Sequence, residues 1–84
     1  MSVDLQAQIE EAGLSAVDYV TTPPWLGSVR FEAGVLRAEG YQVGFDPLDD
    51  NPHHGEVWGS FSKSRQRRLK QLCTWFVSIE GASI

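Results

Sequence analysis

The spacing of apolar residues near the start of the chain predicts two short helices. Ser2 is a favourable N-cap, apolar residues follow at near-helical spacing up to Ala12, and Gly13 is a typical stop. Ser15 is a suitable cap for a second helix that runs through Val20. We therefore expect two helices in the first quarter of the chain.

A proline pair interrupts this helical pattern. Thr21, Thr22, Pro23 and Pro24 come in succession, and a residue that precedes proline is disfavoured in the helical region. Trp25 and Leu26 follow directly. We expect these two large side chains to anchor the loop to the core.

The middle of the chain predicts a short helix followed by a pair of strands. Residues 31–39 read as a helix that ends at Gly40, and residues 41–45 alternate apolar with small or polar side chains. Residues 46–54 contain two prolines and predict a loop, after which residues 56–61 predict a second strand. The connection is short, so an antiparallel pair is expected.

The strongest helical pattern lies near the C-terminus. Ser62 or Ser64 is the expected cap, and the helix is predicted to reach about Val77. Its apolar stripe consists of Leu69, Leu72, Cys73 and Phe76. On this helix Lys63, Arg67 and Lys70 share the opposite face, Arg65 falls near the apolar stripe, and Arg68 and Trp75 share a flank.

These elements predict a small α+β fold in which residues 1–84 form a single domain. N-terminal helices, an antiparallel hairpin and a C-terminal amphipathic helix pack together. Val57 and Trp58 alternate, so one of the two should face outward. The predicted core consists of Leu5, Ile9, Leu36, Val43, Val57, Leu69, Leu72 and Phe76.

Size and composition exclude several classes of protein. At 84 residues and 42% apolar content the chain has room for one modest core, and self-association is a common way to cover leftover apolar surface. Cys73 is the only cysteine, which excludes an internal disulfide and a cysteine zinc cage. The chain shows no secretory leader and no run of about 20 apolar residues. We expect a cytoplasmic protein without a membrane association or a cofactor.

Charge is distributed unevenly along the chain. Residues 1–56 hold ten acidic and two basic side chains, whereas residues 57–84 hold five basic side chains and one acidic side chain. The five cations lie within eight residues and can meet phosphates, an acidic partner or the acidic part of this chain. The net charge of −4 argues against a general nucleic-acid coat protein.

The cations of the C-terminal helix are the main candidate binding residues. Several of them lie in its first turns, where they oppose the helix dipole, so they are expected to have partners. Three partners remain open: the acidic loop of residues 46–56 in the same chain, an acidic protein, and RNA or DNA phosphates. The candidate binding residues are Lys63, Arg65, Arg67, Arg68, Lys70 and Trp75.

The loop and the strand after it hold the densest candidate chemistry. His54 and Glu56 face the same way in an extended segment, and with Arg67 they could supply the base, acid and phosphate clamp of a metal-free ribonuclease. A metal site is not expected, because His53 and His54 are adjacent and point to opposite faces. The first interpretation of His54 is structural: a buried imidazole that donates to a backbone carbonyl.

One resemblance extends over about half of the chain. Its order is Gly34-Val35-Leu36-Arg37, Asp46-Pro47-Leu48, Asp50-Asn51-Pro52, His54, Glu56-Val57, Gly59, a basic helix and Trp75. This order resembles small, uncharacterised bacterial proteins with a D-P-L-x-D-N-P-x-H-x-E-V-x-G core. The resemblance implies a component of a toxin–antitoxin or phage-defence system. It implies no activity and transfers no functional residue.

Together these features favour a non-enzymatic protein-interaction module in a bacterial conflict, defence or regulatory system. A protein partner is the first expectation, and a homodimer is a further option. The alternative is an RNA-binding protein or a small metal-free ribonuclease toxin that uses His54, Glu56 and the basic helix.

Overall fold

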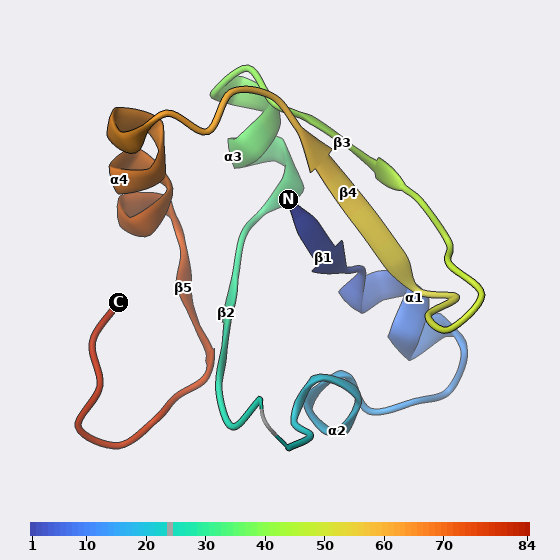
Figure 1. The fold of residues 1–84 in the computed structure, drawn as a ribbon. Coiled ribbons are helices and arrows are strands. Elements are labelled where there is room, and N and C mark those ends of the chain that lie inside the picture. Colours follow the sequence, from blue (N-terminus) through green and yellow to red (C-terminus); the bar gives the residue numbers. More distant parts are fainter. Residues whose placement is uncertain (24) are drawn as a thin grey trace.

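The computed structural model describes residues 1–23 and 25–84, and there the chain alternates strands with short helices (Figure 1). In chain order the elements are β1 (Ser2–Asp4), α1 (Gln6–Glu11), α2 (Ala16–Val20), β2 (Ser28–Arg30), α3 (Ala33–Ala38), β3 (Gln42–Phe45), β4 (His54–Trp58), α4 (Lys63–Leu72) and β5 (Thr74–Val77). The predicted α+β class is confirmed.

The predicted hairpin of β3 and β4 belongs to a three-stranded antiparallel sheet in the order β1-β4-β3, with β4 in the centre. Its register places Val43 opposite Val57. Val57 is 1% exposed and Trp58 is 47% exposed, which confirms that one of these neighbours faces outward. On its other edge β4 pairs with β1, so that Asp4 lies opposite His54.

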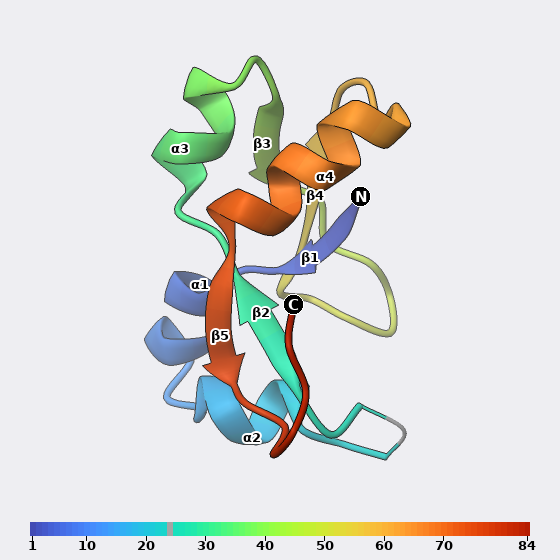
Figure 2. The same cartoon turned by 90° about the vertical axis from the view of Figure 1, so that its left-hand side faces the viewer.

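A second sheet consists of β2 and β5, which pair antiparallel with Val29 opposite Trp75. In both views the two strands lie side by side, and α3 and α4 occupy one end of the molecule (Figures 1 and 2). Helices α1 and α2 lie toward the other end. The strands of the two sheets are therefore hydrogen-bonded separately, and tertiary packing brings the two sheets together.

The prediction that a helix begins at Ser2 is wrong. Residues 2–4 form β1, in which Val3 is half-buried between exposed neighbours. Residues 2–4 form a strand because they hydrogen-bond to backbone groups of β4, which would otherwise be an unpaired edge of the sheet. The helix begins at Gln6 instead, and Gly13 follows it with a φ of 81°, as expected of a helix stop.

The next two helices follow the prediction more closely. The Ser15 hydroxyl accepts a hydrogen bond from the Asp18 backbone N–H, and α2 ends at Val20 as expected. Helix α3 begins at Ala33, two residues later than predicted, and ends before Gly40, whose φ is 94°.

The prediction that the C-terminal helix reaches Val77 is wrong. Helix α4 ends at Leu72, Cys73 is extended, and residues 74–77 form β5. Thr74, Trp75, Phe76 and Val77 are all β-branched or aromatic, and pairing with β2 satisfies their backbone groups. Trp75 therefore shares no helix flank with Arg68, contrary to the prediction.

The buried cluster consists of Leu36, Tyr41, Val57 and Leu69, which come from α3, the turn after it, β4 and α4. Half-buried neighbours complete it: Met1, Val3, Phe31, Val43 and Phe61. Among the eight predicted core residues, Ile9, Leu36, Val57 and Leu69 are buried, and Leu5, Val43, Leu72 and Phe76 are half-buried. Tyr41 was not predicted, although it is 4% exposed.

The loop after the prolines does not anchor to the core. Trp25 and Leu26 are 68% and 69% exposed, so the prediction that they are buried is wrong. The predicted break at Pro23 and Pro24 falls partly on residue 24, which lies outside the described residues. In the part of the chain that the structure describes, no helix has the length and apolar character that a membrane crossing requires.

Candidate functional site

Helix α4 carries the five cations that the sequence singled out, and the structure divides them into two groups. The Ser62 hydroxyl accepts from the Arg65 backbone N–H and so sets the start of the helix. Leu69 is buried on its inner face. The inward or outward direction of each cation follows from that orientation.

Arg65 belongs to the first group, because its side chain forms hydrogen bonds to other residues of the same chain. Its Nε lies 3.1 Å from the Tyr41 hydroxyl and its Nη2 lies 2.7 Å from the Glu39 carbonyl oxygen. The guanidinium also lies 4.5 Å from the centre of the Tyr41 ring, a cation–π distance. Arg65 thus fastens α4 to the C-terminal end of α3, where a cation suits the helix dipole.

Arg68 also has an internal partner. Its Nε and Nη2 lie 3.1 and 3.0 Å from Glu39 Oε1. Between these residues lies a cavity of about 130 Å³, lined by Glu39, Tyr41, Arg65 and Arg68 among others. Ligand pockets usually exceed about 300 Å³, so this space does not suit a small molecule.

The second group consists of Lys63, Arg67 and Lys70. All three are exposed and share one helix face, and within residues 1–23 and 25–84 none of them forms an ion pair. One open interpretation is that the acidic loop of residues 46–56 neutralises α4. Among the described residues, no ion pair joins α4 to that loop. Its carboxylates Asp46 and Glu56 pair elsewhere, and Glu39 is the internal partner of the helix.

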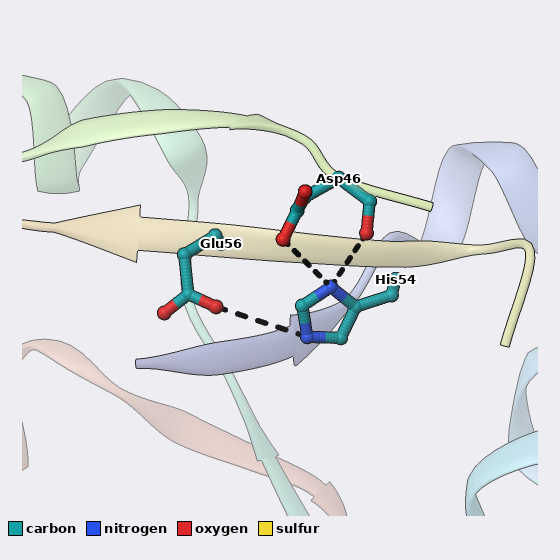
Figure 3. A group of neighbouring side chains, drawn as sticks. All are labelled: Asp46, His54 and Glu56. Carbon is teal, nitrogen blue, oxygen red and sulfur yellow. Dashed lines mark hydrogen bonds and ion pairs between the residues drawn. The ribbon is translucent and has the colours of Figure 1, made fainter. Parts of the chain in front are cut away.

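His54 is buried, 6% exposed, at the start of β4. Its Nδ1 lies 2.7 Å from the Asp46 carbonyl oxygen, and since a carbonyl only accepts, Nδ1 carries the donated proton. This bond ties the loop to the strand, as the structural interpretation of His54 predicts. The Asp46 carboxylate lies 3.5 Å from the same nitrogen (Figure 3).

Glu56 lies on the other side of the imidazole. Its Oε2 is 3.8 Å from His54 Nε2, and its Oε1 is 2.6 Å from the Met1 ammonium nitrogen. The hydrogen bond from that ammonium lowers the pKa of Glu56 below its usual value. Glu56 therefore fixes the N-terminal strand β1 against β4 as a charged group.

The cluster of Asp46, His54 and Glu56 holds ligand atoms within 4.8 Å of one another, but its arrangement does not suit one metal ion. The two carboxylates flank opposite nitrogens of the ring, and Nδ1 already donates to a carbonyl (Figure 3). In the described part of the chain, no hydrogen bond or ion pair joins Arg67 to His54 or Glu56. The contacts of this cluster hold the loop and the N-terminus against β4, which is a structural role.

The ion pair of Met1 and Glu56 predicts a pH-dependent stability. A carboxyl whose pKa is lowered by folding contributes stability above its unfolded pKa, and that contribution is lost as pH falls through its folded pKa. Glu56→Gln, in the chain that begins at Met1, should lower the melting midpoint at pH 7. The difference between the two proteins should be full above the ordinary Glu pKa of 4.5 and should vanish as pH falls through the lower folded pKa.

Thermal melts between pH 3 and pH 7 measure this convergence, and Glu80→Gln is the matched control. Glu80 is exposed and, within the described residues, forms no ion pair. A constant offset between Glu56→Gln and the unaltered protein across this range would contradict the charged role of Glu56.

A groove of about 1240 Å³ lies between the two sheets and the helices, and sequence reasoning missed it. Its lining comes from both sheets and from α1, α2 and α3, with Ile9, Leu36 and Val57 among its buried residues. Trp25 and Val29 line it as well, and they are 68% and 42% exposed. The one signal in the sequence was Trp25 itself, a large apolar residue in a proline-rich loop.

The exposed surface of the molecule is larger than its mass explains. It measures 5884 Å², whereas a folded monomer of 9.3 kDa is expected to expose about 5,000 Å². The radius of gyration is 13.2 Å, against about 12 Å expected for a domain of this length. The molecule therefore exposes about 900 Å² more surface than a compact monomer of its mass.

Comparison of this chain with protein-family models, with curated proteins and with solved structures finds no match. The geometry of the described residues is therefore the basis for a functional proposal.

Proposed function

We propose that this chain is a non-enzymatic protein-interaction module of a bacterial conflict or regulatory system, and that its protein partner docks in the groove. The observation that carries the proposal is the surplus of exposed surface together with a groove lined by apolar side chains. Burying apolar surface is the main driving force of association, at about 25 cal/mol per Å². The bacterial setting rests on the resemblance of residues 34–75.

The environment of His54 supports a role in binding over a role in catalysis. A general base must reach a proton of its substrate, and His54 is only 6% exposed. Glu56, its partner in the ribonuclease alternative, is held by the Met1 ammonium. Both side chains serve the fold in this arrangement.

RNA binding is the alternative, and the exposed cations Lys63, Arg67 and Lys70 favour it. Three phosphate contacts on a single strand would give a slope of log K against log salt of about −2. Filter binding to mixed RNA at two salt concentrations measures that slope. We expect weak binding, since the net charge of the chain is −4, and sub-micromolar salt-sensitive binding would move the function to RNA.

Affinity capture with matched tryptophan variants tests the proposed function. Trp25 lines the groove, whereas Trp58 is also half-exposed but lies outside the lining. A partner protein from the bacterial host should be retained by the unaltered chain and by Trp58→Ala. Trp25→Ala should lose it by at least about tenfold, because a tryptophan that becomes buried on binding is a frequent hot spot.

Nuclease treatment before elution separates protein from nucleic acid in the same experiment. Captured material that disappears with nuclease, or a protein that Trp25→Ala retains at full yield, would argue against the groove as the docking surface. Circular dichroism of both variants should match that of the unaltered chain.

A further inference from the structure

The groove has an acidic rim. Its described lining residues include two cations: the Met1 ammonium, which pairs with Glu56, and Arg30, whose Nη2 lies 3.0 Å from Glu32 Oε1. The exposed carboxylates in the lining are Asp4, Glu10, Glu32 and Asp50. Four carboxylates, one guanidinium and the Met1 ammonium give the lining a formal charge of −2.

The ionisation of Tyr19, which also lines the groove, reports the same field. Burial raises the pKa of its hydroxyl above the usual value, and the negative charges of Asp4 and Asp50 raise it further. A negative potential therefore extends from the rim toward the wall of the groove.

The volume and lining of the groove suit a polypeptide. At about 1240 Å³ it exceeds the range of about 300–1,000 Å³ that is typical of small-molecule pockets. Its walls offer Val29 and Trp25, whose exposed apolar surface needs an apolar cover. Glu10 and Asp50 form no ion pair within the described residues and are free to meet cations of the same partner.

We propose that the occupant of the groove is a segment of another protein with a stripe of apolar side chains flanked by lysines and arginines. This inference rests on the proposed function, because it names the chemistry of the partner at the same surface. The apolar stripe fills the lined interior, and the flanking cations meet the carboxylates of the rim. Recognition of this kind places an amphipathic helix in an apolar groove.

A second copy of the chain fits this surface less well. Two facing rims would each bring a formal charge of −2, and like charges in apposition are unfavourable. The basic helix α4 of a second copy would bring cations without an apolar stripe. Its buried Leu69 already packs in the core, and the outward face carries Lys63, Arg67 and Lys70.

Two labelled model peptides test the inference by fluorescence anisotropy. Both have about 18 residues with leucines at helical spacing, and the other positions are lysine in one and glutamate in the second. The lysine peptide should bind the full chain about tenfold more tightly than the glutamate peptide at about 50 mM salt. This preference should shrink at about 300 mM salt, where surface charges are screened.

Two double variants locate the binding charges. Glu10→Gln/Asp50→Asn removes two rim carboxylates and should weaken the lysine peptide about threefold or more. Glu11→Gln/Glu80→Gln removes two exposed carboxylates outside the lining and should leave its affinity within about twofold. Equal weakening by both pairs would mean unspecific attraction to an acidic protein and would overturn the inference.

Two further outcomes would also overturn it. Equal affinities of the two peptides, combined with Trp25-dependent capture of a host protein, would leave the proposed function standing and remove the basic partner. Sedimentation of the free chain is expected to give a monomer. A dimer that Trp25→Ala dissociates would assign the groove to a second copy.

Discussion

Tyr41→Ala is expected to lower the free energy of unfolding by about 3–5 kcal/mol, the usual cost of truncating a buried aromatic side chain. Tyr41 is 4% exposed, stacks on Phe61 at 5.3 Å between ring centres, and donates to the Ser60 carbonyl oxygen at 2.9 Å. It also accepts from Arg65 and lies beneath its guanidinium. Its loss would detach α4 from the rest of the core.

The expected loss is a large share of the total stability. A domain of 84 residues has about 4–13 kcal/mol in all, at about 0.05–0.15 kcal/mol per residue. Urea denaturation measures the difference directly. Tyr41→Phe is the control, since it keeps the ring and removes the hydroxyl, and it should cost about 1–3 kcal/mol.

A Tyr41→Ala protein within about 1 kcal/mol of the original would mean that the cluster repacks around the gap. In that case the contacts of Arg65 would not be the link that holds α4 in place.

His54→Ala is expected to lower the free energy of unfolding by about 1–3 kcal/mol, because it leaves the Asp46 carbonyl without its donor. The same substitution opens a gap beside β4, since the imidazole is buried. His54→Asn keeps a side-chain N–H near the position of Nδ1 and should recover part of the loss.

Melting midpoints of the three proteins at pH 7 measure this effect, and growth on expression gives a second readout. A His54→Ala protein with an unchanged midpoint and a lost growth arrest or RNA cleavage would favour the ribonuclease alternative. Glu56→Gln should then lose that activity as well, because an acid–base pair fails when either member is removed.

Local patterns in the sequence were enough to determine the turns, two of the helices and the hairpin. Gly13 and Gly40 stop helices because glycine adopts the positive φ that a helix end requires. The alternation of Val57 and Trp58 determines which face of β4 is buried, because successive side chains of a strand point to opposite sides. The hydrogen bond from His54 to a backbone carbonyl was predicted correctly, because the carbonyls of a loop that enters a strand need hydrogen-bond donors.

Pairings between distant residues required the tertiary structure. Residues 2–4 and 74–77 become strands because β4 and β2 provide hydrogen-bond partners for their backbone groups. A local sequence pattern does not show which distant strand will lie alongside. Phe76 fits the helical stripe of Leu69 by spacing, yet the β-branched and aromatic run around it favours a strand once β2 lies alongside.

The division of the cations and the groove itself were likewise decided by the fold. The sequence determined that α4 is basic, whereas the position of Glu39 and Tyr41 decided that Arg65 and Arg68 have partners within the chain. The groove joins surfaces of both sheets and three helices, and its acidic rim draws on residues from 4 to 50. Charge and apolarity are properties of the sequence, but their apposition follows from chain packing, which brings together residues far apart in sequence.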